Sequence, residues 1–146
     1  MKISSKLAMG IHIVIAIDRF AGEYKVTSEF LSGSLSVNPV MVRQILVGLK
    51  HEGITTITDR NKGIELAKRL DKISMYDIYK GVECAEKSIF GFHTNPNERC
   101  PVGANIHNLL DDRFDNLQSE LESNMKKQKL SDIAGDLKQI EIGGGN

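Results

Sequence analysis

The chain has 146 residues, of which 40% are hydrophobic and 26% are charged, and its formal net charge at neutral pH is zero. These proportions exclude a disordered chain and suit one compact domain with an appended dimerisation helix. The longest apolar stretch, residues 7–17, is too short to cross a bilayer, which takes about 20 apolar residues. No secretory signal is visible, so we expect a cytoplasmic protein with no membrane partner.

The charges are divided unevenly along the chain. Residues 1–69 contain ten lysine and arginine residues against six acidic ones, whereas residues 70–146 contain nine against thirteen. A basic half and an acidic half indicate different tasks, because a basic surface attracts polyanions. The first half is therefore a candidate to bind a polyanion.

Two helices are predicted in the first 35 residues. The first starts at Ser4 or Ser5, either of which can cap it, and runs to about Phe20 with apolar residues at helical spacing. After a break at residues 21–23, a short second helix extends from Thr27 to Leu35.

A tight turn at residues 36–38 leads into a third helix that runs from Pro39 to about His51. Asn38 can accept a hydrogen bond from the free amides of the first turn, and proline suits the first helical position. Gly53 ends this helix. Its apolar stripe consists of Val42, Ile45, Leu46 and Leu49.

A short β hairpin follows the third helix. Residues 54–58 are β-branched throughout and predict a strand. Residues 59–63 are rich in turn-forming types, and residues 64–66 can return as the partner strand.

Ser74, with Asp77 three residues later, forms a variant of the capping box and begins a helix that reaches about Cys84. Residues 87–99 are predicted to be a loop. Pro101 opens a helix of about 25 residues, which would span about 38 Å. A helix of this length is longer than a small domain is wide, so we expect part of its apolar face to pack on a second copy of the chain. Its apolar residues are Val102, Ile106, Leu109, Leu110, Phe114, Leu117, Leu121 and Met125.

Ser131 is predicted to cap a last short helix that contains Ile133, Leu137 and Ile140. The glycine-rich tail after it is expected to be disordered.

The predicted fold is mainly α with a small β hairpin: a winged helix-turn-helix followed by a long dimerisation helix. We divide the chain into a DNA-binding domain at residues 1–84 and a sensor loop at residues 85–100. The dimerisation helices occupy residues 101–140, and the disordered tail occupies residues 141–146.

The order of these elements predicts a protein that binds a double-stranded DNA operator. The second helix of a helix-turn-helix enters the major groove, and its N-terminal residues meet base edges. Arginine suits guanine, glutamine suits adenine, and valine can contact a thymine methyl group. The hairpin tip can reach phosphates or an adjacent minor groove. The predicted DNA-binding residues are Ser36, Asn38, Val40, Arg43 and Gln44 in the helix-turn-helix and Arg60 and Lys62 in the wing.

Four segments resemble the Rrf2 family of bacterial transcriptional regulators: residues 1–8, 39–53 and 72–79, with residues 92–103 similar to its YwnA-like branch. The resemblance covers nearly the whole chain except the last ten or so residues. It implies a homodimer with a winged-helix domain and a long dimerisation helix, acting in repression or, less often, in activation.

Two departures from the family pattern bear on its function. Cluster-binding members carry three cysteines before the long helix, whereas this chain has only Cys84 and Cys100. We therefore expect no cofactor, and an iron–sulfur cluster, with His93 or His107 as a further ligand, stays an alternative. The wing is also shorter and has fewer glycines than the family pattern.

Cys100 immediately precedes Pro101, which places it at the expected N-cap of the long helix. The helix dipole favours a thiolate there, and the thiolate reacts with oxidants and electrophiles. We therefore expect Cys100 to be a redox-sensing thiol, with a small packing residue as the alternative. Cys84 is expected to be structural, and the sequence does not show whether the two cysteines can pair.

The leading hypothesis is a repressor that responds to redox or electrophile stress. One alternative is a regulator gated by a small ligand between loop 87–99 and the long helix. Another is a helical protein-interaction module without DNA binding. We find no phosphate-binding glycine loop, nucleophile elbow or paired carboxylates, so we do not expect an enzyme.

Overall fold

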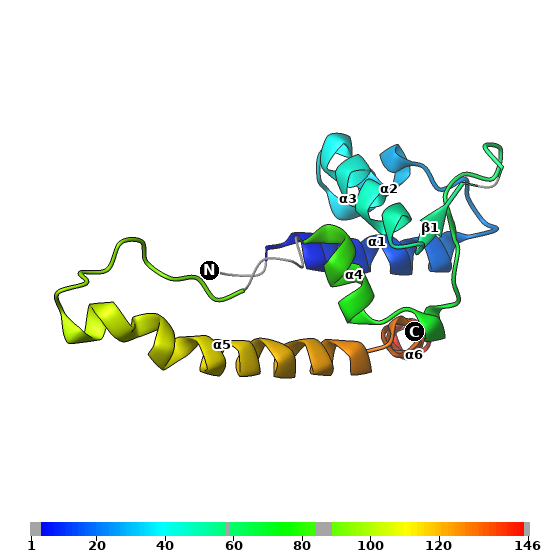
Figure 1. Cartoon of the computed structure of the whole chain (residues 1–146). Helices are drawn as coiled ribbons and strands as arrows, with labels where there is room; N and C mark the ends of the chain where they lie inside the picture. Colours follow the sequence, from blue (N-terminus) through cyan, green and yellow to red (C-terminus); the bar gives the residue numbers. More distant parts are fainter. Residues whose placement is uncertain (1–3, 58, 84–88, 145–146) are drawn as a thin grey trace.

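The computed structural model describes residues 4–57, 59–83 and 89–144 (Figure 1). Within these ranges the chain is mainly helical with one two-stranded antiparallel sheet, which confirms the predicted fold class. The elements in chain order are α1 (Lys6–Phe20), α2 (Ser28–Leu35), α3 (Pro39–His51), β1 (Thr55–Thr56), β2 (Glu65–Leu66), the 3-10 helix η1 (Leu70–Lys72), α4 (Met75–Val82), α5 (Pro101–Lys127) and α6 (Leu130–Gly143).

The helix-turn-helix, α2 and α3, is built by local capping contacts. The Thr27 hydroxyl accepts a hydrogen bond from the Phe30 amide at 3.0 Å. Between the helices Ser36 takes a left-handed conformation with φ 57°. The Asn38 side-chain oxygen then accepts a bond from the Val40 amide at 2.8 Å. The predicted starts of both helices are therefore confirmed.

The wing is shorter than predicted. Thr55 pairs with Leu66 and Thr56 with Glu65, so each strand has two residues rather than the expected five and three. Beyond these pairs the returning chain bonds to another segment: the Ile64 amide donates to the Val26 carbonyl at 2.9 Å. Gly63 permits this approach, since a Cβ there would lie 2.5 Å from the Val26 oxygen and its φ is +84°.

Helix α4 packs closely against both α1 and α3. A Cβ placed on Gly48 of α3 would lie 1.9 Å from the Gly81 carbonyl oxygen of α4, so the two backbones are in direct contact. A Cβ on Gly10 of α1 would lie 2.7 Å from Ile78 of α4. The capping box of Ser74 and Asp77 that starts α4 is present as predicted.

The main core lies between α1, α2, α3 and α4. It is made of aliphatic side chains, as expected for a chain without tryptophan. Its buried members are Ile13, Val14, Ala16, Ile17, Val26, Leu31, Val42, Ile45, Leu49, Ile54, Ile73, Ile78 and Leu130. A second cluster, formed by Tyr79, Ile89 and Met125, joins α4 to α5.

Among the residues that the structure describes, the long helix α5 is attached to the domain near its C-terminal end. The Met75 amide donates to the Gln128 carbonyl at 2.8 Å, and the Leu130 amide donates to the Ile73 carbonyl at 2.9 Å. From this attachment α5 extends away, so its N-terminus lies far from α3 in the same chain (Figure 1).

Two predictions for α6 are corrected by the structure. Ser131 does not cap it, because α6 begins at Leu130, a buried residue whose amide already bonds to Ile73. The helix also continues to Gly143 rather than ending at residue 140. Its last turns are attached to α1 by an ion pair in which Arg19 Nε lies 2.9 Å from Glu141 Oε1.

Across the described residues, we find no helix with the length and hydropathy that crossing a membrane requires.

The Gly48–Gly81 contact predicts an unusual response to alanine. Gly48→Ala should lower the free energy of unfolding by about 1–3 kcal/mol, because the new methyl group overlaps the α4 backbone. The matched variant is Gly135→Ala in α6, where a Cβ meets nothing within 4 Å. It should raise stability by about 0.5–1 kcal/mol, since alanine favours helix more than glycine does.

Urea denaturation followed by circular dichroism, at one protein concentration, measures both variants. Equal effects of the two substitutions would contradict this packing of α3 on α4.

Candidate DNA-binding surface and cysteine site

One face of α3 is left open by the packing of the other. Val42, Ile45 and Leu49 point into the core. The helical period then directs the intervening positions to solvent. The open face carries Val40, Arg43, Gln44, Val47 and Lys50, all of them exposed.

The turn before α3 adds two of the predicted residues to this surface. Ser36 and Asn38 are both exposed. The Asn38 side-chain oxygen is engaged in the helix cap, which leaves its amide nitrogen to donate to a ligand. The predicted residues of the helix-turn-helix therefore lie together at the N-terminal end of α3.

Arg43 is held by an ion pair that the sequence did not predict. Its Nη2 lies 2.9 Å from Glu29 Oε1 on α2, and both side chains are exposed. The pKa of Glu29 is lowered by its own backbone amide, by the Ser28 hydroxyl and by Arg43. An exposed ion pair of this kind contributes little stability, so a stronger anion can displace Glu29 from Arg43.

Arg60 and Lys62 are exposed at the wing turn. This turn is held by Asp59, whose carboxylate accepts a hydrogen bond from the Asn61 amide at 2.9 Å. Among the residues that the structure describes, neither cation takes part in an ion pair. Both charges can therefore meet an external anion.

Cys100 is the N-cap of α5, as expected, with Pro101 as the first helical residue. The backbone amides of Gly103 and Val102 lower the pKa of the Cys100 thiol. The preceding turn packs tightly on this end of the helix, because a Cβ on Gly103 would lie 2.4 Å from the Asn97 carbonyl oxygen. The half-buried thiol therefore lies at a helix N-terminus, which favours its anionic form.

Aromatic rings attach the loop before Cys100 to α5. The Phe92 ring lies 4.1 Å from the His107 ring and 5.4 Å from the Phe114 ring, measured between centroids. Phe90 stacks on Phe114 at 4.8 Å. These ring contacts hold the loop against α5.

Cys84, the other cysteine of the predicted sensor, lies outside the described residues. The prediction about its pairing with Cys100 therefore also lies outside what the structure describes. In the described part of the chain no three His, Cys, Asp or Glu side chains come together to hold a metal ion. His107 is engaged with Asp111, with 3.3 Å between Nδ1 and Oδ1. The donors that the structure describes therefore do not fit an iron–sulfur cluster.

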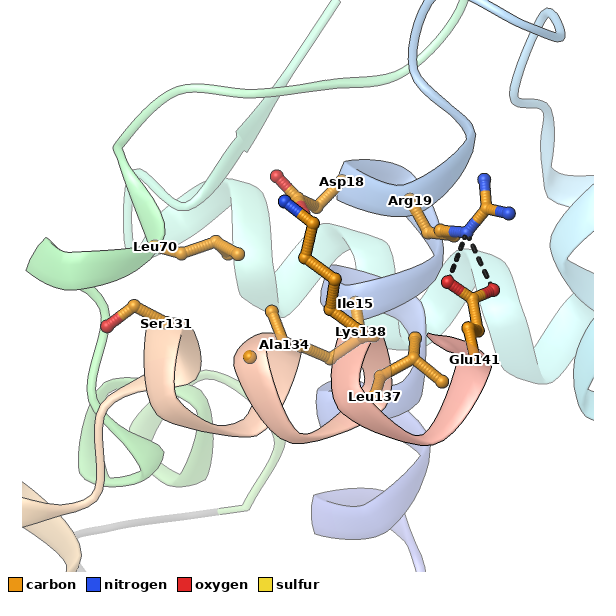
Figure 2. Close-up of a pocket in the computed structure, with 10 residues that line it drawn as sticks. Ile15, Asp18, Arg19, Leu70, Ser131, Ala134, Leu137, Lys138 and Glu141 are labelled. Atoms are coloured by element: carbon orange, nitrogen blue, oxygen red, sulfur yellow. Dashed lines mark hydrogen bonds and ion pairs between the residues drawn. The ribbon is translucent and has the colours of Figure 1, made fainter. Parts of the chain in front are cut away.

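A pocket of about 520 Å³ lies between α1 and α6 (Figure 2). Ile15, Leu70 and Leu137 form its apolar part. The Arg19–Glu141 ion pair closes one end, and it raises the pKa of Arg19. This pocket is not the one that the ligand-gated alternative expects beside loop 87–99.

Comparison with known proteins places this geometry in a family. The sequence model of the Rrf2 family, described as iron-dependent transcriptional regulators, matches residues 3–136. YwnA of Bacillus subtilis strain 168, whose name describes a proposed HTH-type transcriptional regulator, is 36% identical over 135 residues. Those residues make up 92% of this chain and 98% of YwnA.

Solved structures share the fold over nearly the full length. A structure described as that of a proposed DNA-binding protein has a TM-score of 0.70 at 32% identity, and the match covers 88% of this chain and 98% of that one. The global cysteine regulator CymR of Bacillus subtilis has a TM-score of 0.66 at 18% identity, over 92% and 97% of the two chains. At that identity the likeness to CymR shows the fold alone.

The position of Cys100 predicts a thiol that ionises more readily in the folded protein. Because only the thiolate is alkylated, the rate at Cys100 should rise with pH around a midpoint below that of the urea-unfolded chain. Iodoacetamide labelling over a pH series, with peptides resolved by mass spectrometry, measures Cys100 separately from Cys84. A folded midpoint equal to or above the unfolded one would contradict this assignment.

Proposed function

The chain belongs to the Rrf2 family of transcriptional regulators, and from this premise we propose that it is a cytoplasmic homodimeric repressor of redox- or electrophile-responsive genes. Its family and fold are those of regulators and not of enzymes. The observation that carries the proposal is the open face of α3 on a winged helix-turn-helix fold, beside a wing whose turn exposes Arg60 and Lys62.

The proposed DNA contacts follow from this face. A helix fits the major groove, where the Arg43 guanidinium can donate two hydrogen bonds to guanine and the Gln44 amide can pair with adenine. Ser36 and Asn38 are placed to contact nearby phosphates or base edges. Arg60 and Lys62 neutralise phosphates from the wing, which adds affinity that does not depend on sequence.

The homodimer is proposed from the apolar face of α5. Val102, Leu109 and Leu117 are 61%, 49% and 49% exposed in the single chain. They lie N-terminal to Leu121 and Met125, the residues by which α5 packs against α4. Burying these residues against a second α5 would stabilise a dimer and present two copies of α3 to the two halves of an operator.

Cys100 is the proposed sensor. The thiolate sulfur would attack one oxygen of a peroxide, the O–O bond would break, and the products would be a sulfenic acid and, after protonation, water. An α,β-unsaturated carbonyl compound would instead add to the sulfur: a C–S bond forms as the C=C π bond breaks, and the α-carbon takes a proton from water. Either change replaces an anion at the first turn of α5 with a larger neutral group and alters the packing of loop 97–100 on this helix.

Exchange of Arg43 tests the DNA-binding face. Arg43→Ala should weaken binding to a duplex selected from genomic DNA by about tenfold, the range of one lost arginine–guanine contact. Glu29→Gln should tighten binding, because it releases Arg43 and removes a nearby negative charge. Fluorescence anisotropy at several salt concentrations measures both effects.

A double variant separates the two possible causes of a loss. Arg43→Ala could weaken binding only because it exposes the Glu29 carboxylate to DNA. In that case the double variant Arg43→Ala with Glu29→Gln should bind with wild-type affinity. Such a result would contradict the proposal that Arg43 contacts DNA directly. Arg69→Ala is the control and should bind as the wild type does, because Arg69 forms a similar exposed ion pair, with Asp71, at the start of η1, which packs on α6.

Charge placed on the α5 face tests the dimer. Leu109→Glu with Leu117→Glu should convert a dimer into monomers in sedimentation velocity, because two carboxylates would then be buried in the interface. Ser119→Glu, at an exposed polar position of the same helix, should leave the dimer intact. A double variant that remains dimeric would exclude this face as the interface.

Exchange of Cys100 tests the sensor. Dilute hydrogen peroxide should release the wild-type protein from its duplex, whereas Cys100→Ser should stay bound, because a serine hydroxyl is not oxidised under these conditions. Cys84→Ser is the matched control and should still respond. Equal release of wild type and Cys100→Ser would show that the response does not depend on this thiol.

A further inference from the structure

Two exposed apolar side chains, one on α3 and one on the wing, line the same groove between these elements. Val47 of α3 is 71% exposed and Ile57, just after β1, is 55% exposed. Both line a groove of about 320 Å³, with Leu46 and Ile64 in its wall. No contact within the described part of the chain covers either of the two side chains fully.

Val47 belongs to the open face of α3. It follows Val40 by seven residues, so the two side chains project in nearly the same direction and lie about 10.5 Å apart along the axis. This spacing corresponds to about three base-pair steps of 3.4 Å. Arg43 and Gln44 lie between them on the same face. Val47 can therefore make an apolar contact one turn beyond the two polar side chains that are proposed to contact bases.

The charges around the groove indicate what covers it. Arg43 and Lys50 line it together with Val47 and Ile57, so its occupant is both negatively charged and locally apolar. Duplex DNA meets both conditions in its major groove, where the C5-methyl group of thymine is the apolar group among the base edges. A second apolar protein surface would leave Lys50, which takes part in no ion pair among the described residues, without an anion, and it would offer Arg43 nothing in place of Glu29.

We propose that Val47 and Ile57 form a thymine-methyl contact site, so that the operator carries thymine about three base pairs from the step that Val40 reads. This proposal rests on the proposed function, because it requires α3 to enter the major groove. Val47 is then a specificity-determining residue that selects thymine over cytosine, which has no methyl group at C5.

Uracil in place of thymine tests the site without knowledge of the operator. Random duplexes are enriched on the wild-type protein, and the enriched pool is copied once with dTTP and once with dUTP, which differ only in the methyl group. Binding of both copies is measured by anisotropy for wild type, Val47→Ala and Ile142→Ala. Ile142 is 70% exposed on α6 and serves as the control of matched exposure.

The wild-type protein should prefer the thymine copy by at least about fourfold, the factor for one buried methylene-sized group. Val47→Ala should reduce this preference by about fourfold, and Ile142→Ala should leave it unchanged. The comparison between proteins cancels any effect of the methyl groups on DNA stiffness.

Three results would overturn the proposal. If no duplex is enriched, the proposed function fails and this site fails with it. If duplexes bind but Val47→Ala keeps the full thymine preference, only the methyl site is wrong. If Val47→Ala keeps that preference and changes the oligomeric state in sedimentation velocity, the groove is an interface between copies of the chain.

Discussion

The contact between the α3 and α4 backbones at Gly48 and Gly81 is the constraint on which the other features depend. It places α4 directly against α3, while Gly10 brings the same short helix against α1. With its inner face fixed in this way, α3 presents Val40, Arg43, Gln44 and Val47 to solvent. The segment that begins α4 also pairs with the connection between α5 and α6. One helix of eight residues therefore positions the DNA-binding face and anchors the long helix.

This arrangement separates the proposed sensor, Cys100, from the proposed DNA-binding face. Cys100 lies at the free end of a helix that is about 40 Å long at 1.5 Å per residue (Figure 1). Oxidation there can affect α3 through α5 and its attachment to α4, or through a partner subunit packed on the free end. The first route lies within one chain, whereas the second requires the proposed dimer. The aromatic contacts of Phe92 with His107 and Phe114 hold the loop of Cys100 on α5, so a change at sulfur acts on a structured end of this helix.

Features that depend on residues close in sequence could be predicted. Thr27, Asn38 and the Ser74–Asp77 pair cap their helices because capping is decided within one turn. Features made by distant residues could not. The start of α6 comes with a hydrogen bond from Leu130 to Ile73 of another segment, and its last turns are joined to α1 by the Arg19–Glu141 pair. The Glu29–Arg43 pair and the position of Ile57 beside Val47 likewise became visible only in three dimensions.

The central claim is that the open face of α3 and the wing bind DNA. An NMR titration of the deuterated, ¹⁵N-labelled protein with a selected duplex tests it most directly, because each backbone amide reports its own surroundings. The account predicts that the largest shift changes fall on residues 36–47 and 60–62, with small changes in the exposed middle of α5. Shift changes concentrated in α5 or α6, with α3 unaffected, would contradict it.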